Sequence, residues 1–352
     1  MDQAKSEAFA ERFLSDLNSA AVVLMTSIGH QVGLFDAMNG KPPATSEQIA
    51  AEAGLNERYV REWLGAMVTG RVVDHDPDEG AYSLPPEHAA WLTRAAGMDN
   101  MGLQAQYIPL IAEVEQQVIA AFRQGGGVPY SAYTRFHRLM AEDSGAANDS
   151  ALIDTIIPLV PGLPERLKTG IDVADIGCGS GHAVNLMAQV FPASRFVGYD
   201  FSEQGIATGR AEASELGLNN ARFDVQDAAT LDEVERFDFI TAFDAIHDQA
   251  QPAEVLRRIA QALRPDGAFL MVDIRASSSL HENMDHPLGP LLYTMSTMHC
   301  MTVSLALDGM GLGTVWGEQK ARQMLSDVGF TKVDVEAVEG DLFNSYFVAR
   351  KE

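Results

Sequence analysis

Three closely spaced glycines after a strand-like run mark the first place in the chain where a ligand could bind. The run 171–182 reads Ile-Asp-Val-Ala-Asp-Ile-Gly-Cys-Gly-Ser-Gly-His, so an acidic residue, Asp175, stands just before the turn. Glycines let the backbone pass close to a ligand at the carboxyl end of a strand, where open α/β sheets bind cofactors. A dinucleotide fingerprint needs a third glycine where this chain has His182. The segment therefore favours a ligand with an ammonium group over one with a pyrophosphate.

Acidic residues also follow the next three predicted strands, at Asp200, Asp227 and Asp244. A carboxylate after the second strand can accept hydrogen bonds from both ribose hydroxyls of an adenosine. One after the third strand can accept from the adenine amino group, and the fourth lines the same cleft. An acidic surface with aspartates at loop starts would explain any one of these residues, but it explains the set poorly.

The elements that would position these residues alternate short apolar strands with helices. Strands are predicted at 171–176, 195–199, 221–226, 237–243, 268–273, 332–337 and 343–349. This alternation is typical of a mostly parallel sheet covered on both faces. The tight link at Gly340-Asp341 leaves no room for a crossover helix and predicts an antiparallel last pair. Residues 166–352 are therefore predicted to form one α/β domain.

Residues 1–98 follow the order helix, helix, turn, helix, hairpin, which is that of a winged helix. Apolar residues recur at helical spacing from Phe9 to Leu17, and Thr45 with Gln48 makes a capping box. Residues 72–73 and 81–84 are predicted as the two hairpin strands. Residues 99–165 are predicted as a helical connector that could fold over another part of the chain.

Composition excludes several classes of partner. The chain has 352 residues, 46% of them hydrophobic, and a net charge of -24, which would repel a phosphate backbone or anionic lipid. We therefore expect neither nucleic acid nor membrane as the main partner. The chain has only two cysteines, its N-terminus lacks the pattern of a secretory signal, and no apolar run is long enough to span a bilayer. We therefore expect a cytoplasmic protein.

The glycine segment resembles the first motif of the class I S-adenosylmethionine-dependent methyltransferases, acidic-x-Gly-x-Gly-x-Gly, and residues 171–275 with the last strand pair follow that family's order. The resemblance implies a Rossmann-like seven-stranded sheet with an antiparallel last strand, S-adenosyl-L-methionine as cofactor and S-adenosyl-L-homocysteine as product. By position, Asp175 and Gly177 would flank the methionine part, Asp200 would bind the ribose and Asp227 the adenine. The remaining implied cofactor residues are Gly179, Gly181, Phe201, Ala228 and Phe243.

The whole chain more narrowly resembles a bacterial, mycobacterial-type group of methyltransferases with an N-terminal winged helix. The likeness is carried by residues 243–249, 281–287, 296–301 and 311–317. The chain is also similar to the plant and bacterial small-molecule O-methyltransferases. In those, a winged-helix-like domain mediates dimerisation, so the resemblance implies a homodimer through the N-terminal domain.

His247 is the candidate general base. It resembles the histidine of the His-Asp pair that O-methyltransferases use on a small-molecule acceptor, and its ordinary pKa near neutrality suits proton transfer. A histidine that only packs against the cofactor is the alternative. With His247 as base, methylation of an oxygen or a sulfur is favoured, although nitrogen and carbon acceptors share this scaffold.

Acceptor contacts are predicted from two segments. The connector supplies Tyr130, Tyr133 and His137, whose rings could enclose an apolar acceptor. The methionine-rich insertion at 276–317 supplies Met295, Met298 and Trp316 as a lid or wall, since methionine fills irregular spaces. Ordinary hydrophobic core is the alternative for both. No metal is expected, because His281, His286, His299 and Cys300 match no standard zinc spacing.

Two other functions compete with methyl transfer. A transcription regulator that senses S-adenosylmethionine would use the winged helix on DNA, but residues 1–98 hold more acids than bases, and Arg58 and Arg61 have glutamates at pairing distance. A nicotinamide-dependent oxidoreductase is disfavoured by the glycine spacing.

Overall fold

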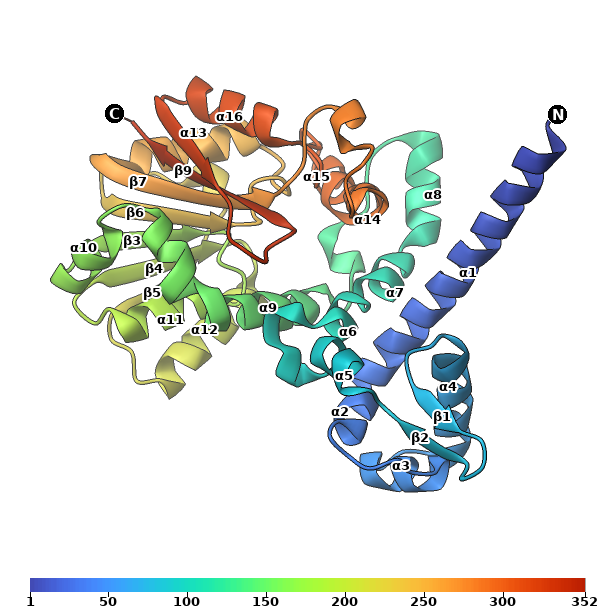
Figure 1. The fold of residues 1–352 in the computed structure, drawn as a ribbon. Helices are drawn as coiled ribbons and strands as arrows, with labels where there is room; N and C mark the ends of the chain where they lie inside the picture. Colours follow the sequence, from blue (N-terminus) through green and yellow to red (C-terminus); the bar gives the residue numbers. More distant parts are fainter. Residues whose placement is uncertain (352) are drawn as a thin grey trace. The chain divides into compact units, whose positions relative to one another are not determined.

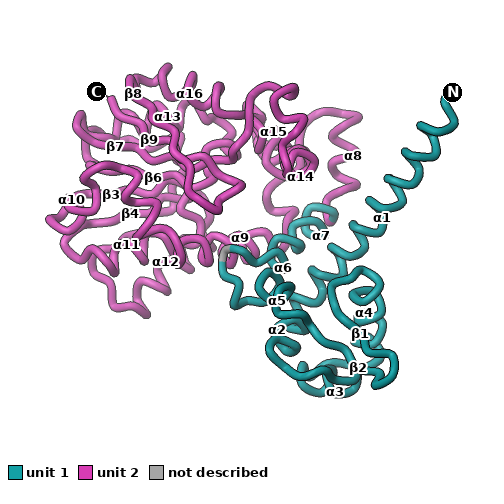
Figure 2. The backbone as a smooth tube through the Cα atoms, in the orientation of Figure 1, with its two compact units in different colours: residues 1–112 teal, residues 113–352 magenta. Residues whose placement is uncertain are grey.

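The computed structural model describes residues 1–351, apart from the side chain of Met98. The chain divides into two units, Met1–Ala112 and Glu113–Glu352 (Figure 2). The finer division expected from the sequence, with boundaries at 98 and 165, stays a prediction.

The first unit has the element order of a winged helix, as predicted. Its core elements are α1 (Gln3–Gln31), α2 (Leu34–Met38), α3 (Ser46–Ala53), α4 (Glu57–Thr69), β1 (Asp74–Asp76) and β2 (Ala81–Ser83), followed by α5 (Pro86–Leu92), a 3₁₀ helix (Arg94–Asp99), α6 (Met101–Gln104) and α7 (Tyr107–Ala112). Thr45 and Gln48 form the expected capping box at α3, and the Asn56 side chain accepts from the Arg58 amide at the start of α4.

The first hairpin strand lies later than predicted. Residues 72–73 were expected in the strand, but β1 pairs with β2 only from Asp74 onward. The amides of Val72 and Val73 instead both donate to the Met67 carbonyl, at 2.8 and 3.3 Å, and so complete the end of α4. These amides therefore complete a helix end instead of a β-ladder.

The second unit is built on a seven-stranded sheet, which confirms the predicted fold (Figure 1). The strands are β3 (Asp172–Ile176), β4 (Arg195–Asp200), β5 (Ala221–Val225), β6 (Phe237–Phe243), β7 (Leu263–Ile274), β8 (Lys332–Glu336) and β9 (Asn344–Arg350), in the order β5-β4-β3-β6-β7-β9-β8. β9 is antiparallel to both β7 and β8, as the tight link at 340–341 predicted, and the remaining pairs are parallel.

Helices cover both faces of this sheet, because neighbouring strand residues point to opposite sides. One apolar cluster joins alternate strand residues such as Phe269 to α13 (Pro252–Ala262) and α16 (Glu318–Asp327). The other joins residues such as Leu270 to α10 (Leu163–Thr169), α11 (His182–Val190) and α12 (Glu203–Glu215). Burial on both sides explains why these strands are nearly continuous apolar runs.

Two further segments of the second unit pack against each other. The first segment, before the sheet, contains α8 (Glu115–Gln124), a 3₁₀ turn (Tyr130–Ala132), α9 (Phe136–Ala147), a π-helical segment (Asn148–Ile156) and a 3₁₀ turn (Ile157–Leu159). The second, the insertion after β7, contains a 3₁₀ turn (Leu280–Asn283), α14 (Gly289–Met295), a π-helical turn (Ser296–Cys300) and α15 (Met301–Ala306). The Val128 amide reaches the Thr302 carbonyl and hydroxyl, and the Tyr133 hydroxyl donates to the Met298 carbonyl at 2.5 Å. A Cβ at Gly127 would lie 1.8 Å from the Thr302 oxygen, so this contact requires glycine.

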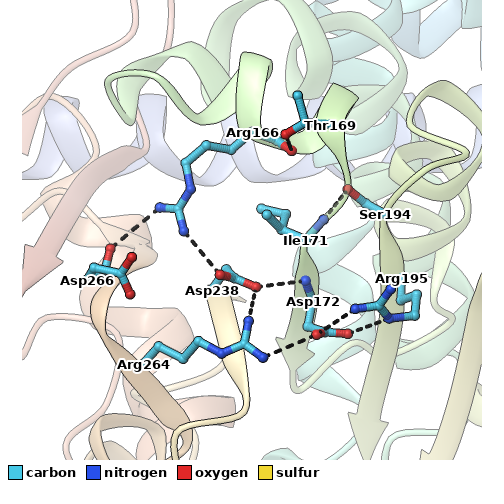
Figure 3. Close-up of polar contacts among 9 residues, drawn as sticks. All are labelled: Arg166, Thr169, Ile171, Asp172, Ser194, Arg195, Asp238, Arg264 and Asp266. Carbon is cyan, nitrogen blue, oxygen red and sulfur yellow. Dashed lines mark hydrogen bonds and ion pairs between the residues drawn. The ribbon is translucent and has the colours of Figure 1, made fainter.

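Charged side chains close the amino edge of the sheet (Figure 3). Asp238, on β6, accepts from the Asp172 amide at 2.9 Å, from Arg166 at 3.2 Å and from Arg264. Arg195 forks onto Asp172 at 2.7 and 2.8 Å and holds the pKa of that carboxyl below its usual value. This network fixes the starts of four strands at the edge opposite the glycine turn.

Among the helices that the structure describes, none combines the length and apolarity needed to cross a lipid bilayer.

Replacement of Asp238 by asparagine should destabilise the second unit by about 1–3 kcal/mol, because it weakens charged hydrogen bonds at a nearly buried site. The urea-unfolding midpoint measures the loss. Asp266→Asn makes the same charge change at an exposed side chain and should leave the midpoint nearly unchanged. Equal midpoints for the two variants would contradict the role given to the network.

Candidate active site

The glycine turn lies across the carboxyl ends of β3 and β4. The amides of Gly177 and Cys178 donate to the Tyr199 carbonyl, at 2.8 and 3.1 Å. Gly177 and Gly181 have φ angles of 73° and 75°, and a Cβ would come within 2.5 Å of Ala245 and 2.3 Å of the Phe223 ring, respectively. Both positions therefore need glycine for conformation and for space.

His182, in the place of a third fingerprint glycine, holds helices together. Its Nδ1 lies 2.5 Å from Glu212 on α12, and its Nε2 lies 2.9 Å from Asp149 in the π-helical segment. Burial lowers the pKa of the imidazole, but the two carboxylates outweigh this and leave it raised. The residue anchors the start of α11 behind the glycine turn.

Asp175 is a buried carboxyl group beneath the turn. It is 2% exposed and accepts from the Thr241 hydroxyl at 2.7 Å. Burial raises its pKa to about 7, although the Thr241 hydrogen bond opposes the shift. A cation bound nearby would stabilise the ionised form, so the position suits a positively charged ligand group.

The other predicted cofactor residues lie along the same edge, because β5, β4, β3 and β6 are neighbours. Asp200 accepts from the Gly179 amide at 2.9 Å with one oxygen and from the Ser202 amide at 2.7 Å with the other. These bonds orient the carboxylate and leave each oxygen a further lone pair. Asp227 similarly accepts from the Ala229 amide at 2.8 Å. The remaining members, Phe201, Ala228 and Phe243, flank these acids.

His247 lies beside this edge with an acidic side chain near each ring nitrogen, hydrogen-bonded to Asp273 and in ion-pair contact with Asp248. Its Nδ1 lies 2.8 Å from Asp273 Oδ1, and its Nε2 lies 3.2 Å from Asp248 Oδ1. The Trp316 indole donates to the same Asp273 oxygen at 2.9 Å. Trp316, predicted as an acceptor contact, is thus also hydrogen-bonded behind the candidate base.

The electrostatics of this group are dominated by buried acids. Burial lowers the pKa of His247, but Asp273 and Asp248 raise it by more, so the net pKa lies well above the ordinary histidine value. Asp244 has a φ angle of 48°, and burial together with Asp273 raises its pKa to about 8. Both groups therefore favour their protonated forms more than an exposed histidine or aspartate does.

Sequence reasoning missed Asp273. The only local signal for Asp273 was a single charged residue at the end of the apolar run 268–273. Such a residue is costly to bury unless a partner exists, and that partner, His247, is 26 residues away in sequence.

Donor atoms of His247, Asp248 and Cys300 lie within 4.8 Å of one another, a spacing that a divalent metal could bridge. Metal binding requires a neutral imidazole and a thiolate. Here the acids raise the pKa of His247, and burial together with Asp248 raises the pKa of Cys300 to about 11. Both shifts oppose a metal, so we assign none.

Aromatic rings from the connector and the insertion meet next to this group. The Tyr130 ring centroid lies 4.8 Å from that of His137, 5.5 Å from that of His299 and 6.0 Å from that of Phe201. Burial raises the pKa of the Tyr130 hydroxyl, and the negative charges of Asp248 and Asp200 add to the shift. Tyr130 therefore packs among rings from three segments: Phe201 after β4, His137 on α9 and His299 in the π-helical turn. Met295 and Met298 are half-buried in the insertion.

Two protein-family models match the chain, one within each of its two structural units. Residues 20–94 match the model of an Rv2258c-like winged HTH domain, and residues 167–329 match that of a methyltransferase domain. Residues 167–329 thus form a methyltransferase domain, and the seven-stranded sheet with its antiparallel last strand has the class I methyltransferase fold.

Solved structures share the fold of this chain over nearly its whole length. A putative O-methyltransferase from Nostoc punctiforme has a TM-score of 0.73 at 17% identity, covering 97% of this chain and 98% of its own. Human N-acetylserotonin methyltransferase, solved in complex with S-adenosylmethionine, has a TM-score of 0.69 at 18% identity, covering 97% of each chain.

The curated relatives each match about a third of the chain. The uncharacterised methyltransferase YcgJ of Bacillus subtilis is 31% identical over 102 residues, 29% of this chain and 40% of its own. Trans-aconitate 2-methyltransferase of Variovorax paradoxus is 34% identical over 108 residues, 30% of this chain and 38% of its own. The chain thus spans about two fifths of the length of these curated relatives.

Proposed function

We propose that this protein binds S-adenosylmethionine at the carboxyl edge of its sheet and methylates a hydroxyl or thiol of a small-molecule acceptor, with His247 as general base. The observation that carries the proposal is the buried His247–Asp273 hydrogen bond, with Asp248 3.2 Å from the other ring nitrogen. The cofactor supplies a methyl group on a sulfonium, which is a good leaving group.

The residues of the edge fit the parts of this cofactor. Asp175, buried under the turn, suits the ammonium of the methionine part. Asp200, whose oxygens are already oriented by two amides, suits the ribose hydroxyls, and Asp227 suits the adenine amino group. The complex of human N-acetylserotonin methyltransferase with S-adenosylmethionine supports the assignment through the shared fold.

His247 is oriented for proton transfer. A hydrogen bond from Nδ1 to Asp273 fixes the tautomer in which Nε2 carries a lone pair. The imidazole must be neutral to accept the acceptor's proton at Nε2, and the two acids oppose this by raising its pKa. A bound sulfonium nearby disfavours the imidazolium and so helps to free the base. Such a base contributes about 10²–10⁴-fold to turnover.

The ion pairs of α4 favour the enzyme over a DNA-binding regulator. Arg61 pairs with Glu57 at 2.7 Å, and Arg58 pairs with Glu62. A winged helix that binds DNA needs guanidinium groups free for phosphates. These pairs neutralise the two arginines on their own helix.

We further propose a homodimer through α1. Phe9, Phe13 and Leu17, all on one face of this helix, are 57%, 51% and 56% exposed. Contiguous exposed apolar side chains mark interaction surfaces, and the acidic chain argues against a membrane as the partner. A second copy of the same helix supplies a matching apolar face.

Cofactor binding should release a proton near neutral pH. About half of the Asp175 carboxyls are protonated at pH 7, and the ammonium of S-adenosylhomocysteine stabilises the ionised form. Calorimetric titration at pH 7 in buffers of different ionisation enthalpy should therefore show net proton release, of which Asp175 contributes about half a proton. Asp175→Asn should lower the release by that amount, whereas Asp232→Asn, at an exposed position, should leave it unchanged. Binding without proton release in the unmodified chain would remove Asp175 from the cofactor site.

His247→Ala should lower kcat by about 10²–10⁴-fold and leave the affinity for S-adenosylhomocysteine nearly intact. Formation of that product on acceptors found among small phenols and thiols measures the change. Because the base works only when deprotonated, kcat/KM should rise with pH to above the ordinary range of histidine. Asp248→Asn removes a charge that raises the His247 pKa, so this rise should move to lower pH. A profile that does not move would leave His247 a structural role only.

Phe13→Glu with Leu17→Glu should convert the dimer to a monomer, because two carboxylates would be buried at the helix contact. Light scattering coupled to size exclusion gives the mass. Ser15→Glu with Asn18→Glu adds the same charge to the opposite face of α1 and should remain dimeric. Loss of the dimer in both variants, or in neither, would exclude this face as the contact.

A further inference from the structure

His299 is a buried side chain with unused hydrogen-bonding capacity. It lies in the π-helical turn Ser296–Cys300 and is 0% exposed. Within the described part of the chain, neither Nδ1 nor Nε2 has a hydrogen-bond partner. Buried polar atoms without partners are rare in native proteins because burial removes their bonds to water.

Aromatic neighbours hold the ring in a fixed orientation. Phe136 stacks on it, with centroids 3.8 Å apart and planes within 9°, and Tyr133 packs edge-on at 4.7 Å. Burial lowers the pKa of His299 to about 4, with Asp248 opposing the shift. The imidazole is therefore neutral at pH 7 and offers one N–H donor and one nitrogen acceptor.

His299 lies close to His247, on the side of the site where the acceptor is proposed to bind. It precedes Cys300, whose sulfur lies within 4.8 Å of the donor atoms of His247 and Asp248. Tyr130, which also packs against Phe201 beside the glycine edge, packs edge-on against it. The titratable groups that act on His299 are Asp248, His247 and His137, with no lysine or arginine among them. A negatively charged acceptor would therefore be repelled by Asp248 and would find no lysine or arginine among these groups to offset the repulsion.

We propose that His299 selects the acceptor: its imidazole hydrogen-bonds a polar group of an uncharged aromatic acceptor, at a point separate from the group that faces His247. This inference rests on the proposed methyl transfer, since it places the acceptor beside His247. The fixed ring gives directionality, and the aromatic residues around it contact the rest of the acceptor. His299 thereby distinguishes acceptors with a second polar group from those that lack one.

The test compares the binding of 2-naphthol with that of its 2,3-, 2,6- and 2,7-dihydroxy relatives to the complex with S-adenosylhomocysteine. In the unmodified chain, at least one diol should bind roughly tenfold more tightly than 2-naphthol. His299→Phe keeps an aromatic ring but removes both nitrogens and should abolish this gain. His281→Phe makes the same change at an exposed histidine and should keep it.

The outcomes separate this inference from the function on which it rests. Failure of the unmodified chain to bind S-adenosylhomocysteine would overturn the proposed function. Cofactor binding without a gain for any diol, or a gain that survives in His299→Phe, would overturn the role of His299. Should His299→Phe itself lose the cofactor, His299→Leu removes the nitrogens with a smaller side chain and answers the same question.

Discussion

The hydrogen bonds to one oxygen of Asp273 are the constraint on which the active site depends. This carboxylate is 1% exposed, and its Oδ1 accepts from His247, from the Trp316 indole and from the Ile274 amide. A buried carboxylate is tolerated only with such partners, and loss of one would leave an uncompensated charge. The bonds join the end of β7, the loop after β6 and the end of the insertion, so they fix the orientation of His247 relative to the glycine turn.

The two edges of the sheet balance their charges differently. At the amino edge, Asp172 and Asp238 are matched by three arginines, so the acids there are neutralised within the fold. At the carboxyl edge, burial raises the pKa of Asp175 to about 7 and that of Asp244 to about 8, and neither has an arginine or lysine bonded to it. A ligand that carries an ammonium and a sulfonium supplies the missing positive charge. The same sheet therefore has one edge built for stability and the other for a cationic cofactor.

Local patterns in the sequence were sufficient for the sheet but not for the acceptor site. The seven strands were predicted because burial on both faces makes each an apolar run, and Asp200 and Asp227 were predicted as cofactor residues because they stand at the ends of strand patterns. Asp273 and His299 were not identified as site residues. Their significance depends on contacts with residues far away in sequence, such as Phe136 on His299 and Trp316 on Asp273. The hairpin strand was misplaced for a similar reason, since the Met67 carbonyl competes for its amides.

Buried polar atoms without partners gather where the acceptor is expected. Among the described residues they include one oxygen each of Asp244, Asp248 and Asp273 and both ring nitrogens of His299. Each costs stability, so a fold retains several together only where a ligand or a reaction uses them. The fixed orientations seen here, from the Asp273 bonds and the stacking on His299, mean that little reorganisation is needed when a ligand arrives. The unpartnered polar groups near His247 and His299 thus lower the stability of the fold, and the same groups determine which acceptor the site binds.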